Sequence, residues 1–316
     1  MKNIVSLSPM FGKFSAAAPR RLEKAGFQVD ILRPNQISSE TISGTLNDET
    51  VAIVSGLEKL DGPVMDKAPN LRVIVKHGIG VDNIDLNAAK SRGIEVYNEP
   101  GSNSDAVADL ALGLMFAMAR KIVEGAEIVA GGGWEKITGV GVWGKTLGIL
   151  GFGNVGRLLA LRGRGLNMRV MAYDPFFNKE YADQYGIEQA SIDDILKEAD
   201  FISLHMPLLD STRNMVDRTF FQKMKSSAIL INTARGGVVN EDDLYQALKN
   251  REIAAAAFDA FAQEPPIGNP LFTLPNFIGT PHMGANTVDA MAKTSNMVAD
   301  TLLQALNGEK AQHRMV

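Results

Sequence analysis

Short apolar runs alternate with longer segments of helical periodicity along most of this 316-residue chain. Runs of three to six residues rich in Val, Ile, Leu, Ala or Phe are typical of buried β-strands. The predicted strands are Ile4–Leu7, Val51–Val54, Leu71–Val75, Ile94–Tyr97, Thr146–Leu150, Met168–Tyr173, Phe201–Leu204, Ala228–Ile231, Ala254–Phe258 and Phe277–Gly279. Because strands that alternate with helices build βαβ units, the pattern predicts an α/β fold with mostly parallel sheets.

Two segments have the length and periodicity of long helices. One covers about Asn103–Ala126 and is rich in Ala, Leu and Met on all sides, which predicts burial of most of its surface. The other covers about Thr287–Asn307 and places its apolar residues on one face. Pro100-Gly101 precedes the first helix and Gly284-Ala285-Asn286 precedes the second, so we expect domain junctions at these two places.

Three glycines and a tryptophan, Gly131 to Trp134, interrupt the chain after the first predicted helix. Both a flexible surface arm and a loop anchored by Trp134 would have this composition. The pattern does not distinguish the two.

The composition is that of a globular protein, with 45% hydrophobic and 22% charged residues. Lys and Arg number 32 against 36 Asp and Glu, so no basic excess exists to bind nucleic acid or an anionic membrane. The longest nearly apolar run, Ala106–Ala119, is interrupted by Asp109 and is too short to span a bilayer. The absence of cysteine excludes thiolate metal sites and a cysteine nucleophile, and we expect no metal. The N-terminus predicts a strand instead of a secretory signal, so we expect a cytoplasmic protein.

A glycine-rich loop follows the predicted strand Thr146–Leu150. Gly151, Gly153 and Gly156 form a G-x-G-x-x-G pattern that leads into a predicted helix, about Val155 to Gly165. Such glycines permit a tight turn, close approach of a pyrophosphate and helix–strand packing. Asp174 ends the next strand, where a carboxylate accepts hydrogen bonds from ribose hydroxyls and repels a 2′-phosphate. The sequence therefore predicts binding of NAD in preference to NADP.

Three polar residues follow other predicted strands. Arg235 comes after Ala228–Ile231, Glu264 follows the next strand, and His282 comes after Phe277–Gly279. Because ligands bind outside the carboxyl ends of parallel strands, we expect all three at the edge that carries the glycine loop. Arg235 is suited to hold a substrate carboxylate, His282 to exchange a proton with a hydroxyl, and Glu264 to orient His282. Each residue alone is more often structural, and their combination predicts oxidation of a 2-hydroxy acid.

Several further segments carry a resemblance that covers nearly the whole chain. They are His77 to Asp85, Asn98 to Ser104, Gly144 to Gly148, His205 to Leu208, Asn232 to Gly237, Asp259 with Glu264-Pro265, and Thr280 to His282. In these segments the chain resembles the D-isomer-specific 2-hydroxyacid dehydrogenase family, specifically its D-3-phosphoglycerate dehydrogenase-like group.

The resemblance implies two Rossmann-like domains, a classical NAD-binding domain inserted into a flavodoxin-like substrate-binding domain. We place the NAD-binding domain at residues 99–284 and the catalytic substrate domain at 1–98 plus 285–316. Closure of the two domains over the substrate is the corresponding hypothesis. A homodimer formed mainly through the nucleotide domain is also implied.

The family implies Arg235, Glu264 and His282 as the catalytic set, in agreement with their positions after the strands. The expected cofactor-binding residues are Gly151, Gly153, Asn154, Val155, Gly156, Asp174, His205, Met206, Thr233, Ala234, Asp259, Gly284 and Ala285. The expected substrate-binding residues are Lys76, His77, Gly78, Ile79, Gly80, Arg235 and His282. A packed loop position is an equal alternative for His205, and a solvent-facing position is an equal alternative for His77.

The expected reaction interconverts a small D-2-hydroxy acid and its 2-keto acid, with 3-phosphoglycerate and phosphohydroxypyruvate as the first choice of substrate. Two residues depart from the pattern of the family. The first weakens the choice of a phosphorylated substrate, and the second changes the charge near the site. Lys76 stands where phosphoglycerate enzymes commonly have Arg, and Glu99 stands where the family often has Thr. Reduction of glyoxylate, hydroxypyruvate or another 2-keto acid is the alternative. A further alternative is an NADH-sensing, corepressor-like binding protein.

Overall fold

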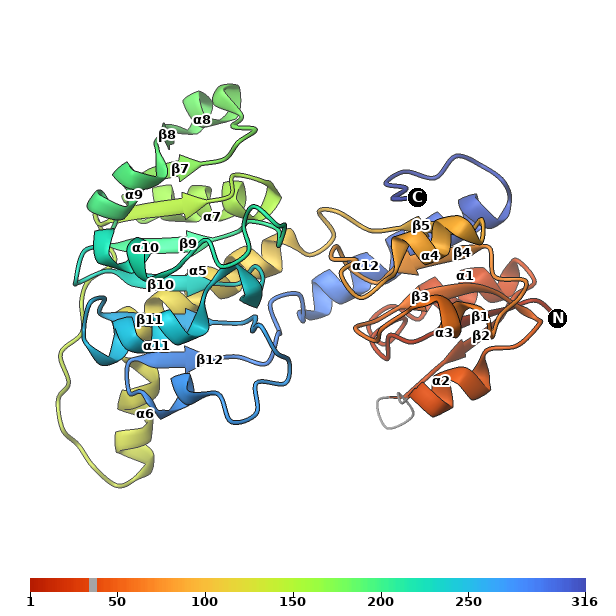
Figure 1. Ribbon diagram of the computed structural model, residues 1–316, viewed down its shortest axis with the longest axis horizontal. Coiled ribbons are helices and arrows are strands. Elements are labelled where there is room, and N and C mark those ends of the chain that lie inside the picture. The colour runs from red at the N-terminus through yellow and green to blue at the C-terminus, as the bar shows by residue number, and fades with distance from the viewer. Residues whose placement is uncertain (34–38) are drawn as a thin grey trace. The chain divides into compact units, whose positions relative to one another are not determined.

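The computed structural model describes residues 1–33 and 39–316 and divides them into two compact units (Figure 1). Unit 1 contains residues 1–103 and 285–316, and unit 2 contains residues 104–284. The chain leaves unit 1 after Asn103, where helix α5 begins at Ser104, and returns at Ala285. The first junction is thus at the start of the helix, a few residues beyond the predicted position near Pro100-Gly101.

Unit 1 is built on a parallel sheet of five strands in its described residues, in the order β2-β1-β3-β4-β5. Its elements are β1 (Asn3–Ser6), α1 (Ala17–Lys24), β2 (Gln28–Ile31), α2 (Ser39–Thr45), β3 (Thr50–Ser55), α3 (Gly62–Met65), β4 (Val73–Lys76), α4 (Leu86–Ser91), β5 (Glu95–Tyr97) and α12 (Val288–Leu306). Strand β2 was not predicted, because this edge strand alternates polar Gln28 and Asp30 with apolar residues instead of forming an apolar run. The chain's last residues pair with the other edge, where Arg314 forms an antiparallel bridge with Tyr97.

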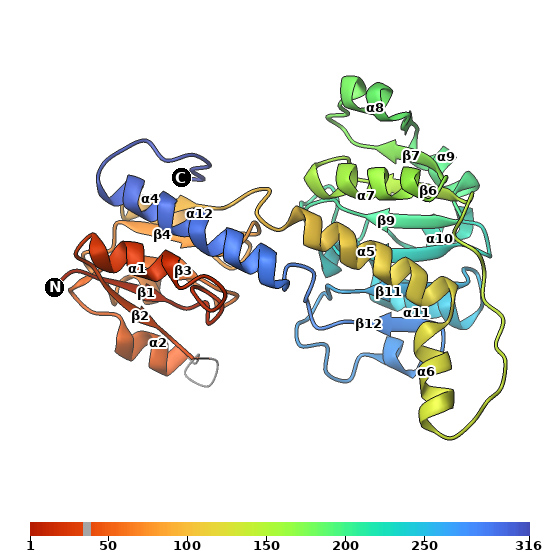
Figure 2. The same cartoon turned by 180° about the vertical axis from the view of Figure 1, so that it is seen from behind.

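Helices cover both faces of this sheet. Helices α1 and α12 pack on one face around Ile4, Leu22 and Leu302, as Figure 2 shows from behind. Helices α2, α3 and α4 pack on the other face around Ile53 and Ile74. Because both faces are covered, the central strands are apolar on both sides, which explains why their sequences are continuous apolar runs.

Unit 2 is built on a second parallel sheet, of seven strands in the order β12-β11-β10-β9-β6-β7-β8. Its elements are α5 (Ser104–Ala119), α6 (Ile122–Ala130), β6 (Thr146–Leu150), α7 (Asn154–Gly165), β7 (Arg169–Tyr173), α8 (Lys179–Tyr185), β8 (Glu188–Gln189), α9 (Ile192–Glu198), β9 (Phe201–Leu204), α10 (Arg218–Lys223), β10 (Ile229–Asn232), the 3-10 helix η2 (Gly236–Val238), α11 (Glu241–Lys249), β11 (Ala255–Phe258), the 3-10 helix η3 (Pro270–Thr273) and β12 (Phe277–Gly279). After β7 and β8 the chain crosses to β9 on the other side of β6. The order therefore reverses between β6 and β9, and such a switch point is where ligands bind in open α/β sheets.

Two apolar cores lie on the two faces of the unit 2 sheet. Helices α5 and α7 form one layer, and α9, α10 and α11 form the other (Figures 1 and 2). An ion pair between Arg162 of α7 and Asp109 of α5, with an N–O distance of 2.7 Å, joins the first two helices at the surface. This layering leaves the strand ends for loops.

The first long helix differs from the prediction, because it is two helices instead of one. Helix α5 ends at Ala119 and α6 begins at Ile122, with Lys121 in the left-handed region at φ 53°. The Val140 N–H donates to the Ala119 carbonyl at 2.7 Å, so a segment distant in sequence binds a helix-end carbonyl. Helical periodicity continues past Ala119, but this tertiary contact ends the helix.

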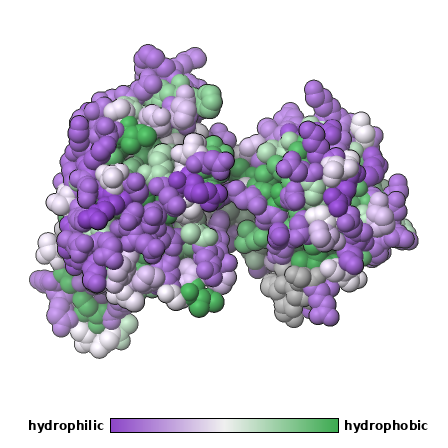
Figure 3. Space-filling view, in the orientation of Figure 1, coloured by the Kyte–Doolittle hydropathy of each residue, from purple (hydrophilic) through white to green (hydrophobic). Residues whose placement is uncertain are grey.

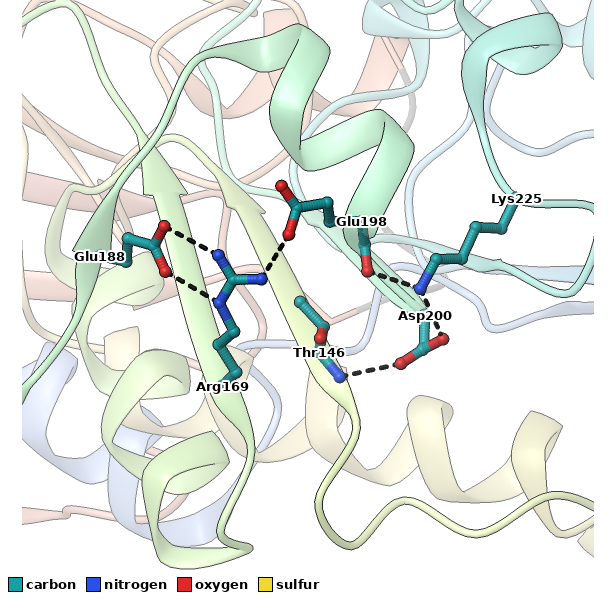
Figure 4. A network of polar contacts seen from close by, with 6 residues as sticks. All are labelled: Thr146, Arg169, Glu188, Glu198, Asp200 and Lys225. Atoms are coloured by element: carbon teal, nitrogen blue, oxygen red, sulfur yellow. Dashed lines mark hydrogen bonds and ion pairs between the residues drawn. The ribbon is translucent and has the colours of Figure 1, made fainter.

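The edge of the unit 2 sheet where its strands begin carries a network of ion pairs (Figure 4). Arg169 binds Glu188 with both a 2.8 Å and a 2.9 Å contact, and it also pairs with Glu198. Lys225 pairs with Asp200, whose other oxygen accepts from the Thr146 N–H. These charges are paired with one another, whereas the opposite edge, where the strands end, carries the glycine loop.

Across residues 1–33 and 39–316, none of the helices combines the length and the apolar character needed to cross a membrane.

Candidate active site

The glycine loop connects β6 to α7 at the switch point of the unit 2 sheet. Gly151 has φ +99°, and a Cβ there would lie 2.6 Å from the His205 carbonyl carbon. A Cβ on Gly156 would lie 2.1 Å from the Gly151 oxygen, so both positions require glycine. A Cβ on Gly153 would meet no atom within 4 Å, and Gly153 is the N-cap of α7. The space in front of this helix N-terminus is therefore open to a phosphate group.

Asp174 lies at the end of β7, next to the glycine loop. One carboxylate oxygen accepts from the Phe152 N–H at 2.7 Å, and the other accepts from the Phe176 N–H at 2.8 Å. Two backbone donors thus hold the carboxylate in one orientation, and each oxygen keeps a second acceptor site. This arrangement suits a pair of ribose hydroxyls and opposes a phosphate ester at the same place.

Arg235 lies in the loop after β10, and Asn232 shapes this loop. The Asn232 side chain donates to the Arg235 carbonyl at 3.0 Å and accepts from the Ala234 N–H at 3.0 Å. Gly236 follows directly, and a Cβ there would lie 1.8 Å from the Phe261 carbonyl carbon, so only glycine fits. Sequence reasoning did not assign a role to Asn232, although an Asn at a strand end before a turn is a recognisable signal.

His282 and Glu264 form a direct pair at the same edge. The His282 Nδ1 contacts the two Glu264 carboxylate oxygens at 2.9 and 2.8 Å. The Phe261 N–H also donates to Glu264, at 3.0 Å. Burial favours the neutral form of Glu264, but the hydrogen bonds from His282 and Phe261 and the nearby charges of His282 and Arg235 outweigh it and lower the pKa of Glu264. Glu264 is therefore an ionised partner that orients the imidazole.

The other ring nitrogen of His282, Nε2, is available to exchange a proton with a ligand. No hydrogen bond to Nε2 is found among the residues that the structure describes, and the side chain is 36% exposed. His282 has φ 49°, an unusual conformation for a residue other than glycine. The backbone holds this conformation because Asp259 anchors the residues that follow it.

Asp259 is buried at the end of β11 and binds the His282 loop. One oxygen accepts from the Thr280 hydroxyl at 2.6 Å and from the Met283 N–H at 2.8 Å, and the other accepts from the Gly284 N–H at 2.8 Å. The structure thus gives Asp259 a scaffolding position, which the sequence did not reveal. Direct contact with the cofactor remains a prediction for this residue.

His205 follows β9 and does not have the properties of an acid or base. Its Nε2 contacts the Ser203 hydroxyl at 2.9 Å, and burial lowers the pKa of His205 to about 3. The ring is therefore neutral near pH 7. Contact with the cofactor and a packed loop position both stay predictions for His205.

Lys76 and His77 belong to unit 1, where Lys76 ends β4 and His77 begins the loop after it. Lys76 is buried and donates to the Gly56 carbonyl and, at 2.7 Å, to Asn83 Oδ1. His77 contacts the Ser8 hydroxyl at 3.2 Å and the Ser295 hydroxyl at 3.0 Å, and burial lowers its pKa to about 4. His77 therefore bridges two serines inside unit 1, a position that neither of its two predicted alternatives described. The serines are 69 and 218 residues away in sequence, so no local pattern indicates these contacts.

The predicted site residues therefore fall into two groups by unit. Unit 2 brings together, at the carboxyl edge of one sheet, Gly151, Gly153, Asn154, Val155, Gly156, Asp174, His205, Met206, Thr233, Ala234, Arg235, Asp259, Glu264, His282 and Gly284. Unit 1 contains Lys76, His77, Gly78, Ile79, Gly80 and Ala285.

The residues present fit a dinucleotide. The helix N-terminus at Gly153 is open, and Asp174 is oriented by two backbone donors. The buried Thr233 hydroxyl at the end of β10 has no hydrogen-bond partner among the described residues, so it is an orphaned polar group that a ligand would satisfy. Within the same residues, no cluster of His, Asp or Glu suited to a metal ion is found.

Comparisons with known proteins agree with this geometry. Residues 112–284 match the family model described as "D-isomer specific 2-hydroxyacid dehydrogenase, NAD binding domain". The chain is 41% identical over 280 residues to a D-3-phosphoglycerate dehydrogenase of Methanocaldococcus jannaschii, covering 88% of this chain and 53% of that protein. It is 40% identical over 261 residues to a hydroxypyruvate reductase of Thermotoga maritima, covering 81% of this chain and 84% of that protein.

The same agreement holds for solved structures. A Thermus thermophilus protein superposes with a TM-score of 0.89 at 33% identity, covering 99% of this chain and 100% of that one. The chain spans about half the length of the phosphoglycerate dehydrogenases it matches.

Proposed function

Because the chain belongs to the D-isomer specific 2-hydroxyacid dehydrogenase family, we propose that it interconverts a small D-2-hydroxy acid and its 2-keto acid with NAD. The observation that carries the proposal is the His282–Glu264 pair, which lies at the edge of the sheet that also carries the glycine loop. Relatives named for phosphoglycerate and for hydroxypyruvate support the reaction class and leave both substrate choices in place.

The protein side of the reaction needs three side chains. Arg235 binds the substrate carboxylate and polarises the neighbouring C2 oxygen. His282, oriented through Nδ1 by Glu264, gives a proton from Nε2 to that oxygen in the reductive direction and takes it back in the oxidative direction. When bound, the nicotinamide cofactor supplies or accepts the hydride at C2.

The nucleotide preference follows from Asp174. Its carboxylate is held by the Phe152 and Phe176 N–H groups and would accept hydrogen bonds from the ribose hydroxyls of NAD. A 2′-phosphate would meet the same negative charge at close range. We therefore assign NAD, with unit 2 as its binding domain and Arg235, Glu264 and His282 as catalytic residues.

Unit 1 is assigned the substrate-binding role. Within the loop Gly78 to Gly80, the N–H groups of Ile79 and Gly80 are those through which it would meet a substrate carboxylate, because the Gly78 N–H donates to the Lys76 carbonyl. The cofactor and substrate assignments of the remaining residues are part of the same proposal. A cytoplasmic location is also part of the proposal.

A homodimer is also part of the proposal. Helix α6 buries none of its residues, and apolar atoms gather over it in Figure 3. Val129 is 56% exposed, Trp134 84% and Trp143 70%, so Trp134 does not anchor its loop within the chain. An apolar surface of this kind is typical of an interface between subunits. Val129→Lys should convert the dimer to a monomer in light scattering, and a wild-type monomer would refute the interface.

The test of the activity is NADH oxidation by the purified protein with a panel of 2-keto acids. The panel contains glyoxylate, hydroxypyruvate, pyruvate and phosphohydroxypyruvate. His282→Asn is the matched control, because it should keep NADH binding and lose turnover. A wild-type protein that binds NADH and captures a partner protein without turning over any acid would favour the corepressor-like alternative. A protein that neither binds NADH nor reduces any acid would refute the proposal.

A further inference from the structure

Lys76 is the last residue of β4, directly before the loop, and its ammonium group points into unit 1. The side chain is only 6% exposed. It donates to the carbonyl oxygen of Gly56 and, at 2.7 Å, to the side-chain oxygen of Asn83. A buried lysine that bridges two loops would have to break both bonds before it could reach a ligand.

Asn83 ties this lysine into a closed network. Its amide nitrogen donates to the Glu58 carbonyl at 2.6 Å and to the Ser55 hydroxyl at 3.2 Å. Its backbone carbonyl accepts from the Leu60 N–H at 2.8 Å. The loop after β3 and the loop after β4 are therefore held together, with the ammonium group of Lys76 in the joint.

The carboxylate of Glu58 lies at the same joint. A Cβ on Gly56, whose carbonyl accepts from Lys76, would lie 2.6 Å from one of the Glu58 oxygens. The Glu58 carboxylate is half-buried, and one of its oxygens has no hydrogen-bond partner among the described residues. The pKa of Glu58 is raised above its ordinary value, because burial outweighs the hydrogen bonds from the Glu58 and Leu57 backbone N–H groups and the positive charge of Lys76. A second anion brought to this loop would therefore meet the carboxylate of Glu58 as well as the ammonium group of Lys76.

His77 supplies no charge either. The Ser295 hydroxyl donates its proton to the Met291 carbonyl at 2.8 Å, so it accepts from His77 and places the ring proton on Nε2. His77 Nδ1 then accepts from Ser8. Both nitrogens of a neutral ring are thus used within unit 1.

What remains for a ligand is the backbone. The His77 and Gly78 N–H groups donate to Ser55 and Lys76 carbonyls, at 3.0 and 2.8 Å. No hydrogen bond is found for the N–H groups of Ile79 and Gly80 within residues 1–33 and 39–316. Two neutral donors suit the single charge of a carboxylate, whereas a phosphate monoester carries nearly two charges, which these two donors alone would not compensate.

We infer that this loop selects a 2-keto acid whose only anionic group is its carboxylate, because Lys76 is bound within unit 1 and the neighbouring carboxylate of Glu58 repels a phosphorylated substrate. The inference rests on the proposed function and chooses between the two substrate classes that it leaves in place.

The experiment compares kcat/KM with NADH for hydroxypyruvate and phosphohydroxypyruvate, which differ only in the phosphate. We expect kcat/KM to be about 10-fold or more higher for hydroxypyruvate than for phosphohydroxypyruvate. This factor corresponds to one charge-assisted hydrogen bond, which the loop does not offer to the phosphate. Equal use of the two acids, or a preference for phosphohydroxypyruvate, would overturn the inference and leave the proposed function intact. Reduction of neither acid, nor of any other in the panel, would refute both.

A variant tests the electrostatic cause. Glu58→Gln removes the repelling charge and should move the ratio of the two kcat/KM values toward phosphohydroxypyruvate by about 3-fold or more. Glu40→Gln removes the same charge from an exposed position on α2 and should leave the ratio unchanged. The same ratio in both variants would refute the role of Glu58. If Glu58→Gln fails to fold, a second experiment measures inhibition of the wild type by inorganic phosphate at a matched ionic strength. We expect no inhibition, and competitive inhibition by phosphate would overturn the inference.

Discussion

Replacement of Glu99 by Gln is expected to stabilise the protein at alkaline pH. Glu99 is 2% exposed, and one of its carboxylate oxygens has no hydrogen-bond partner among the described residues. Its backbone N–H donates to the Gly78 carbonyl at 2.9 Å, so the residue lies beside the loop after β4. The family resemblance assigned no role to Glu99, and the structure buries its side chain.

The magnitude follows from the proton affinity of this carboxyl. Burial raises the pKa of Glu99 from its ordinary value of 4.5 to about 7, a hydrogen bond with Thr301 opposes the rise, and the charge of Asp300 adds to it. Because the folded chain binds the proton more tightly than the unfolded chain, stability falls as the pH rises from about 4.5 to about 7. Above pH 7 the ionised carboxyl costs up to roughly 3 kcal/mol, a cost that the neutral amide of the Glu99→Gln variant would not incur.

The assay is differential scanning calorimetry at pH 5 and pH 8. Tryptophan fluorescence would report on the wrong part of the chain, because both tryptophans, Trp134 and Trp143, belong to unit 2. At pH 8 the transition of unit 1 in Glu99→Gln should lie roughly 5 °C or more above that of the wild type, and at pH 5 the difference should shrink.

Glu23→Gln is the control for this experiment, because Glu23 is exposed on α1 of the same unit. It should change the transition little at either pH. Identical wild-type and Glu99→Gln transitions at pH 8, or a gain that does not depend on pH, would refute the assignment of a buried, ionisable Glu99.

The remaining predictions concern unit 2. Arg235→Ala should raise KM and lower kcat together, with kcat/KM reduced about 100-fold or more, and Arg235→Lys should recover part of the loss; steady-state kinetics with unchanged kcat/KM would remove Arg235 from the mechanism. Glu264→Gln should lower kcat about 10-fold or more and alter the pH–rate profile, because His282 loses its ionised partner; an unmoved profile would show that the two residues are uncoupled. Asp174→Ala should weaken NADH binding about 10-fold and relax the discrimination against NADPH in fluorescence titrations; an unchanged preference would assign the ribose contact elsewhere.

The strands and the glycine loop were predictable from sequence because their signals are local. Strands β6, β9 and β12 have the bounds predicted for them, and α12 begins at Val288 after its N-cap Thr287. Apolar runs flanked by turn residues are sufficient for such elements. The elements that were missed, β2, β8 and the break between α5 and α6, depend on edge pairing and on the Val140 contact, which no local pattern encodes.

For the candidate site, the sequence alone determined which residues follow which strand, and therefore that Arg235, Glu264 and His282 share an edge with the glycine loop. A parallel α/β pattern brings the carboxyl ends of the strands together whatever their side chains contact. The sequence therefore also determined that a guanidinium, a carboxylate and an imidazole lie at this edge. Only the tertiary structure decided the partners of each group. It paired Glu264 with His282, turned Asp259 to the Met283 and Gly284 N–H groups, and pointed Lys76 into the protein. Hydrogen bonds depend on distances between residues far apart in sequence, and those distances exist only in the packed fold.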